Sequence, residues 1–123
     1  MLKVASMPYK NKREYGRVFI QLASHVYSDE FLNIYIDIDG PIDRLSNGNI
    51  YSVGGLKFNY FMDGRIYKIG DVEFNYFMDG RIYKIGNSEF NYFMDGRIYK
   101  IGSTEFNYYL DGRIYKIGDT YYE

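Results

Sequence analysis

The chain has 123 residues, a formal net charge of −1 and no cysteine. This length suits one small domain with its own core and is too short for two ordinary domains. With no cysteine and a single histidine, the sequence excludes disulfides, thiol catalysis and a multi-histidine metal site within one chain. We therefore expect no metal and no cofactor, and the balanced charge argues against nucleic acid as a partner.

The N-terminal third, residues 1–40, is expected to cap the repeats that follow it. Apolar and polar residues alternate over residues 31–37, which predicts a strand. The pattern over residues 17–27 fits either a strand or a helical stripe, and we favour the strand. No apolar run approaches the roughly 20 residues of a membrane span, and the first 16 residues lack the apolar stretch of a secretory signal. A cytoplasmic protein without membrane contact is the expectation.

An Asp-x-Asp motif follows an apolar run at Asp37 and Asp39. It resembles the first motif of the haloacid dehalogenase phosphatases, which implies Asp37 as nucleophile and Asp39 as general acid/base. That family needs alternating helices and strands, whereas hairpin repeats follow here. We therefore favour a strand that ends in an Asp-Gly turn.

Tandem repetition dominates the rest of the chain. Phe-Asn-Tyr begins at Phe58, Phe74, Phe90 and Phe106, a strict period of sixteen residues. Four nearly identical units are preceded by a fifth, degenerate copy. The repeats span residues 41–118, with a short tail at 119–123, all within one domain.

Two kinds of turn divide each unit into a hairpin. Asp-Gly between apolar segments predicts a type I′ turn, because both residues tolerate positive φ; these turns are Asp63-Gly64, Asp79-Gly80, Asp95-Gly96 and Asp111-Gly112. Between units, a glycine comes first, which suits a type II′ turn or a longer loop, at Gly70-Asp71, Gly86-Asn87, Gly102-Ser103 and Gly118-Asp119. Such short connections predict an all-β, up-and-down antiparallel meander.

Pairing about the Asp-Gly turn sorts the side chains of a unit onto two faces. The face expected to be buried carries Phe58, Tyr60, Met62, Arg65, Tyr67 and Ile69; the wetter face carries Asn59, Phe61, Ile66 and Lys68. Two-residue loops at both ends would stagger the strands so that the sheet coils into a barrel. A longer loop would leave an open, twisted sheet, and the sequence leaves both alternatives open.

Rows of tyrosine and arginine are the candidate ligand-binding residues. Exposed tyrosines could stack sugars or bases, whereas buried ones would form cross-strand pairs, which we favour. The arginines could bind an anionic polymer, but the acidic residues of each unit cancel their charge. The two rows are Tyr60, Tyr67, Tyr76, Tyr83, Tyr92, Tyr99, Tyr108 and Tyr115, and Arg65, Arg81, Arg97 and Arg113.

The segment Tyr-x-x-Asp-Gly-Arg-Ile at residues 60–66 resembles the short hairpin repeats of bacterial proteins, nearest to the tyrosine-aspartate (Rhs-type) repeats. The resemblance covers residues 56–118, although the period here is shorter and stricter. It implies a repeat scaffold that wraps or presents a surface, and it implies no catalytic residue.

These patterns favour a non-enzymatic repeat module that acts as a protein-binding or assembly scaffold. The alternatives are a module that binds glycan or single-stranded nucleic acid through the Tyr and Arg rows, and an Asp37/Asp39 phosphatase. Some 40 N-terminal residues look too few to cover an open sheet of ten strands, and the final hairpin leaves an edge. We therefore expect a homodimer, or another protein, to cover it.

Overall fold

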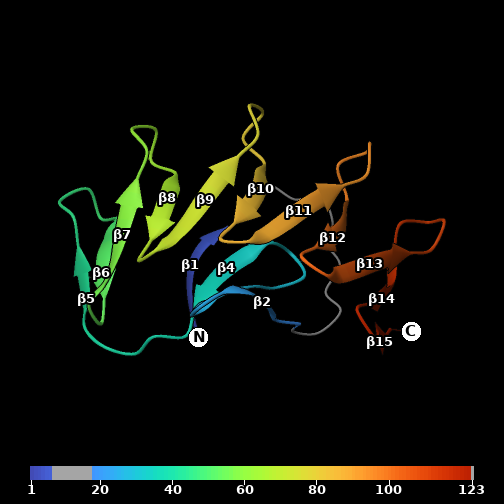
Figure 1. The fold of residues 1–123 in the computed structure, drawn as a ribbon, viewed down its shortest axis with the longest axis horizontal. Helices are drawn as coiled ribbons and strands as arrows, with labels where there is room; N and C mark the ends of the chain where they lie inside the picture. The colour runs from blue at the N-terminus through green and yellow to red at the C-terminus, as the bar shows by residue number, and fades with distance from the viewer. Residues whose placement is uncertain (7–17, 123) are drawn as a thin grey trace.

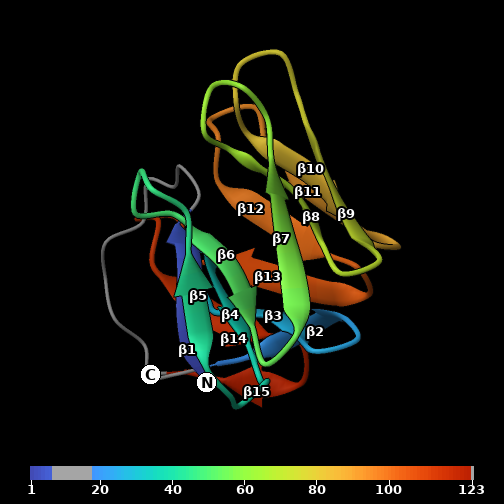
Figure 2. The same ribbon diagram turned by 90° about the vertical axis from the view of Figure 1, so that its left-hand side faces the viewer.

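The computed structural model describes residues 1–6 and 18–122, which form fifteen strands in two antiparallel sheets (Figures 1 and 2). The predicted all-β meander is confirmed. The N-terminal sheet has the order β1-β4-β3-β2. Its strands are β1 (Leu2–Ser6), β2 (Ile20–Ala23), β3 (Val26–Ser28) and β4 (Asn33–Ile36). The described residues contain no helix long and apolar enough to cross a membrane.

The second sheet, the repeat sheet, has eleven strands in sequence order. Each strand pairs only with its neighbours in the chain, because every connection is a tight turn. Its strands are β5 (Ile42–Arg44), β6 (Ile50–Val53), β7 (Leu56–Tyr60), β8 (Ile66–Ile69), β9 (Val72–Tyr76), β10 (Ile82–Ile85), β11 (Ser88–Tyr92), β12 (Ile98–Ile101), β13 (Thr104–Tyr108), β14 (Ile114–Ile117) and β15 (Thr120–Tyr121). The sheet ends at β5 and β15, which do not pair, so of the two alternatives the open sheet is the one observed.

The N-terminal sheet confirms the strand predicted at residues 31–37, which appears as β4. The segment predicted over residues 17–27 contains two strands, β2 and β3, and no helix in its described part; Arg17 lies outside the described residues. His25 turns the chain between them at φ 65. Strand β1 was not anticipated, because only five residues form it and its apolar residues do not alternate cleanly.

The N-terminal sheet lies against the inner face of the repeat sheet, which curves around it (Figures 1 and 2). The contact reaches the third hairpin of the four nearly identical units. The Ser88 hydroxyl on β11 donates a hydrogen bond to the Leu22 carbonyl over 2.6 Å. At Gly86, a side-chain Cβ would lie only 3.0 Å from the Ala23 Cβ, so the two sheets pack closely there. The described N-terminal strands thus cover a face of the repeats, and none of them pairs with the edge strand β5.

A single core joins the two sheets. Leu22, Val26 and Ile34 from the N-terminal sheet belong to the same buried cluster as the apolar rows of the repeats. Each repeat contributes one phenylalanine and two isoleucines, all at most 6% exposed: Phe58, Phe74, Phe90, Phe106; Ile66, Ile82, Ile98, Ile114; and Ile69, Ile85, Ile101, Ile117. The expectation that the N-terminal segment is too short to cover this face is therefore wrong, and the homodimer stays a prediction without that argument.

The turns between units, here called base turns, are two-residue loops, the shorter of the two alternatives that the sequence left open. Ile69 pairs with Val72 across Gly70-Asp71, and the same register recurs in the later units. Gly70 has φ 58 while Asp71 keeps negative φ, which is the φ pattern of a type II′ turn. Only glycine adopts the first position without strain.

The Asp-Gly turns, here called tip turns, are not type I′, and that prediction is wrong. The Gly64 N–H donates to the Phe61 carbonyl over 3.0 Å, which makes Met62 and Asp63 the central residues of the turn. Asp63 has negative φ and Gly64 has φ 94. The loop therefore has three residues, a type I turn followed by a glycine in the left-handed region. The same arrangement recurs at Gly80, Gly96 and Gly112.

The longer loop inserts a bulge that corrects the predicted faces. Tyr60 pairs with Ile66 and Asn59 pairs with Lys68, so Tyr67 is an extra residue without a partner. The buried positions of Phe58 and Ile69 are confirmed, but Ile66 is buried instead of Tyr67. Met62 and Arg65, expected on the buried face, are both exposed: Met62 lies in the loop, and Arg65 follows it directly and accepts a hydrogen bond from the Phe61 N–H.

Candidate ligand-binding site

One tyrosine row holds successive repeats together. The Tyr76 hydroxyl on β9 donates to the Ile66 carbonyl of the preceding hairpin over 2.6 Å. The same bond joins Tyr60 to Ile50, Tyr92 to Ile82 and Tyr108 to Ile98. These tyrosines are half-buried, and burial raises the pKa of Tyr76 to about 12. Their hydroxyls are therefore engaged within the repeat sheet.

The arginine row is neutralised at each tip turn. Arg65 Nε donates to Asp63 Oδ2 over 2.7 Å, and the same bond recurs in all four nearly identical units. The Arg65 backbone N–H donates to Asp63 Oδ1, which holds the turn in shape. These donors, the backbone N–H first, lower the pKa of the Asp63 and Asp79 carboxyls. Each arginine therefore carries its own counter-charge.

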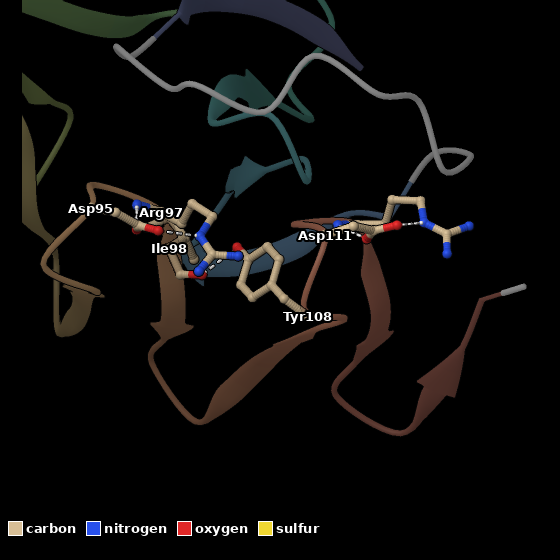
Figure 3. A network of polar contacts seen from close by, with 6 residues as sticks. Asp95, Arg97, Ile98, Tyr108 and Asp111 are labelled. Atoms are coloured by element: carbon tan, nitrogen blue, oxygen red, sulfur yellow. Dashed lines mark hydrogen bonds and ion pairs between the residues drawn. The ribbon is translucent and has the colours of Figure 1, made fainter.

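Three of the four arginines, Arg65, Arg81 and Arg97, also reach the tyrosine of the next repeat. The Arg65 guanidinium carbon lies 4.5 Å from the Tyr76 ring centroid, and Arg97 lies 4.6 Å from that of Tyr108 (Figure 3). Such distances are typical of cation–π contacts. One ring face of these tyrosines is thus covered by a side chain of the protein.

The other predicted tyrosine row lies at the bulges on the outer side of the hairpins. Tyr67, Tyr83 and Tyr99 are exposed, and Tyr115 is half-buried. Tyr67 packs against Phe61 of its own hairpin with ring centroids 5.1 Å apart. Phe61 in turn meets Tyr76 of the next hairpin at 6.0 Å. The structure therefore separates the two tyrosine rows, which the predicted register placed opposite one another.

The sequence analysis did not predict a row of fully exposed apolar residues at the tip turns. Met62, Met78, Met94 and Leu110 stand at the first loop position of the tip turns, and Met78 is 108% exposed. The tip turns lie at the ends of the hairpins opposite the base turns (Figure 1), and Gly64 and Gly80 of the first two line a cavity together with β1. A glycine at the third position, as in Met62-Asp63-Gly64, is also typical of a three-residue loop. This pattern could have predicted the exposed position in the sequence.

Adjacent hairpins enclose small pockets, here called tip slots, just below these exposed residues. The slot between the β7–β8 and β9–β10 hairpins has a volume of about 320 Å³. The next slot, between β9–β10 and β11–β12, has about 350 Å³. The first slot is lined by Phe61 and Arg65 of one hairpin and by residues of the next, which are Phe74, Asn75, Tyr76, Phe77, Met78 and Tyr83. Phe77 separates the slots and lines both.

The tip slots combine aromatic walls with little net charge. Their arginines are paired with aspartates, and on the neighbouring strands Lys68 lies opposite Glu73 in register. The side-chain amides of Asn75 and Asn91, which line the two slots, make no hydrogen bond within the described part of the chain. An uncharged ligand with hydrogen-bond acceptors suits this chemistry.

Two other places contain residues that the sequence analysis named as candidates. The phosphatase resemblance implies Asp37 as the nucleophile. Here Asp37 Oδ1 is hydrogen-bonded to His25 Nδ1 over 2.8 Å, and Asp39 is exposed. A cavity of about 660 Å³ lies between β1 and the edges of the first hairpins, with Tyr60 and Arg65 in its lining. Among residues 1–6 and 18–122, no cluster of three or more His, Asp or Glu side chains is arranged to hold a metal.

Comparison of the chain with protein-family models, curated proteins and solved structures gives no match. The likeness to tyrosine-aspartate repeats therefore stays a resemblance in residues 56–118.

Proposed function

We propose that the chain is a non-enzymatic β-hairpin repeat module that works as a protein-binding scaffold through its tip edge. The observation that carries this proposal is the row of fully exposed Met62, Met78, Met94 and Leu110 above the aromatic tip slots. Fully exposed apolar side chains that recur on every tip, beside the exposed Phe61 and Phe77, favour an interaction site. The row has no role in the core, because these side chains point out of the fold.

The residue types at the tips favour a protein partner. Methionine is flexible and polarizable, and methionine-rich surfaces adapt to ligands of varied shape. Aromatic side chains such as Phe61 and Phe77, which are 41% and 40% exposed, supply rigid contact area at a low entropic cost. Together they form an adaptable rim over fixed aromatic walls.

Charge distinguishes this proposal from nucleic-acid binding. Affinity for nucleic acid depends on unpaired cations that contact phosphates. Here Arg65, Arg81, Arg97 and Arg113 are each bound to an aspartate at 2.7 Å. Half of the predicted ligand-binding tyrosines are also engaged with the backbone of the preceding repeat. Binding of a glycan to the exposed rings remains an alternative outcome of the tests below.

A peptide-display selection tests the proposed function. Random peptides are selected on the immobilised wild-type protein. The enrichment of each sequence is compared with its enrichment on a tip variant, M62Q/M78Q/M94Q/L110Q. The control variant is D71N/S103N/D119N, which gives all four base turns the asparagine that Asn87 already supplies. We expect sequences that are enriched on the wild type and on the control but not on the tip variant. Enrichment that is absent, or equal on the tip variant, would contradict the proposal.

A further inference from the structure

We propose that the cavity beside β1 binds an extended acidic peptide, which adds as a strand to the free edge of β1. This cavity, here called the β1 cavity, is lined by all of β1 and by residues of the first three hairpins of the repeat sheet. Its volume of about 660 Å³ lies in the usual range of ligand-binding cavities. The site goes beyond the proposed function, because none of the exposed apolar residues of the tip turns lines it.

The β1 cavity follows the edge of β1 and not one of its faces. Side chains of a strand alternate between the two faces, so a cavity on one face meets every second residue. All five residues of Leu2–Ser6 line the cavity, and the single bulge at Val4 shifts the alternation only once. Strand β1 is the outer strand of the N-terminal sheet (Figure 2), and among the described residues it pairs only with β4. Its second edge therefore presents backbone N–H and C=O groups to which a further strand can bond.

The degenerate first copy of the repeat supplies a positive charge without a counter-charge. Arg44 stands sixteen residues before Tyr60, at the position where the later units have a tyrosine. Asn47 and Asn49 replace the aspartate and the arginine that form the ion pair of the later tip turns. Arg44 donates to the Gly48 carbonyl over 3.0 Å and forms no ion pair with a described Asp or Glu. Its charge is therefore available to a ligand.

The charge of the lining selects an acidic ligand. Lys3, Arg44 and Arg65 line the β1 cavity, and no described Asp or Glu lines it. Arg65 is already bound to Asp63 at 2.7 Å, so Arg44 is the arginine with which a ligand carboxylate can form a two-point pair. An acidic side chain on the ligand is therefore favoured over a basic one.

The tip glycines leave room for the backbone of such a ligand. Gly48, Gly64 and Gly80 line the cavity, and a Cβ added at any of the three would meet nothing within 4 Å. Ile50 and Ile66 add an apolar part to the lining. At the usual rise per residue, a strand of five residues matches the length of β1, about 16 Å. A strand with acidic and apolar residues in alternation suits both the charge and the apolar part of the cavity.

Fluorescence anisotropy with a labelled acidic hexapeptide, Glu-Val-Glu-Val-Glu-Val, tests the inference, with the basic hexapeptide Lys-Val-Lys-Val-Lys-Val as the reference ligand. We expect the acidic hexapeptide to bind about tenfold more tightly or better, and added salt to weaken its binding. Arg44→Tyr gives the degenerate copy the residue of the later units and should remove this preference. Lys57→Gln, which removes an exposed cation that does not line the cavity, should leave binding unchanged.

A pair of modified ligands tests the addition of a strand. The backbone N–H groups of successive residues point to opposite edges of a strand, and only one edge can pair with β1. N-methylation of the three glutamates removes the N–H groups of one edge, and N-methylation of the three valines removes those of the other. We expect one of the two methylated peptides to lose binding and the other to keep most of it.

Equal affinity for the acidic and the basic hexapeptide would overturn this inference. Binding that Arg44→Tyr leaves intact, although thermal melting shows the variant folded, would also overturn it. Equal binding of the two methylated peptides would indicate a bound anion and not an added strand. Chitohexaose should bind more weakly than the acidic hexapeptide, and tighter binding would assign the ligand to another class.

The tip variant M62Q/M78Q/M94Q/L110Q separates this inference from the proposed function. It should keep its affinity for the acidic hexapeptide, because none of its four positions lines the β1 cavity. Loss of binding in this variant would place the hexapeptide at the tip turns and overturn the inference. If peptide display yields sequences that depend on the tip residues while the acidic hexapeptide does not bind, the proposed function stands and only this inference fails.

Discussion

The base turns and tip turns of the repeats both place a glycine at positive φ, yet their surroundings differ. At the base, Gly86 has φ 60 and lies against Ala23 of the N-terminal sheet. At the tip of the same hairpin, Gly80 has φ 94 and open space around it. Each hairpin thus has one end that is packed into the fold and one end that is free. Stability depends on the base end, and the proposed binding on the tip end.

The largest difference is expected between two phenylalanines of one strand. Phe90 lies in the core at 3% exposure, whereas Phe93, three residues nearer the tip, is 41% exposed. Phe90→Ala should lower the free energy of unfolding by about 3–5 kcal/mol, because it leaves a cavity between the sheets. Phe93→Ala should cost less than half as much. Urea denaturation of both variants measures this, and equal losses would refute the assignment of inner and outer residues.

The two glycines allow a closer test of base against tip. Gly80→Ala should cost about 1–2 kcal/mol, from the positive φ alone. Gly86→Ala has the same backbone penalty and also forces Ala23 away from a Cβ at 3.0 Å, which should add about 1–3 kcal/mol. Thermal melting should therefore rank wild type above Gly80→Ala and Gly80→Ala above Gly86→Ala. The reverse order of the two variants would mean that the N-terminal sheet does not rest on this turn.

A smaller effect is expected from the hydroxyl groups of the two tyrosine rows. Tyr76→Phe removes the hydrogen bond to the Ile66 carbonyl and should cost about 0.5–1.5 kcal/mol. Tyr83→Phe is the matched control, since this exposed hydroxyl makes no hydrogen bond to a described residue. Chemical denaturation of the pair measures the difference, which should vanish if the Tyr76 bond does not join the repeats.

Alkaline pH provides a last and more gradual comparison. The pKa of Tyr76 is about 12 in the folded protein, because burial disfavours the phenolate, against 10.0 for an unperturbed tyrosine. The folded state therefore favours the protonated ring, so its contribution to stability is complete below pH 10 and is lost as the pH rises to 12. Urea midpoints between pH 9 and pH 12 should fall more steeply for wild type than for Tyr76→Phe. Parallel curves would contradict this.

Local patterns were enough to predict the meander and the positions of its base turns, although not the length of these turns. A sixteen-residue period with two glycine-containing turns permits only short antiparallel connections, so the topology follows from the chain itself. The base turns also follow, because Gly70 and its equivalents need only their own positive φ and no distant contact. The alternation over residues 31–37 predicted β4 for the same reason.

Which residues are exposed near the tip turns depends on a difference of one residue in the strand register. Asp63-Gly64 is compatible with a two-residue loop and with the last two positions of a three-residue loop. The bulge at Tyr67 brings Ile66 to the core. Burial of this isoleucine in all four units is what favours the three-residue loop over the two-residue loop. Because a shift of one residue reverses a side chain's direction, the tip slots combine Arg65, Arg81, Tyr76, Tyr83 and Tyr92 of the two predicted rows with phenylalanines that the prediction left out.

The sequence by itself determined the repeat length, the antiparallel order and the positions of the base turns, because these depend on φ preferences and on residues close in the chain. Tertiary structure decided the rest. The N-terminal sheet covers the inner face of the repeats through contacts such as Ser88 to Leu22, which are 66 residues apart. Whether the sheet stays open, and which side chains face water, are settled by such long-range packing, since no local pattern specifies which surface another segment will cover.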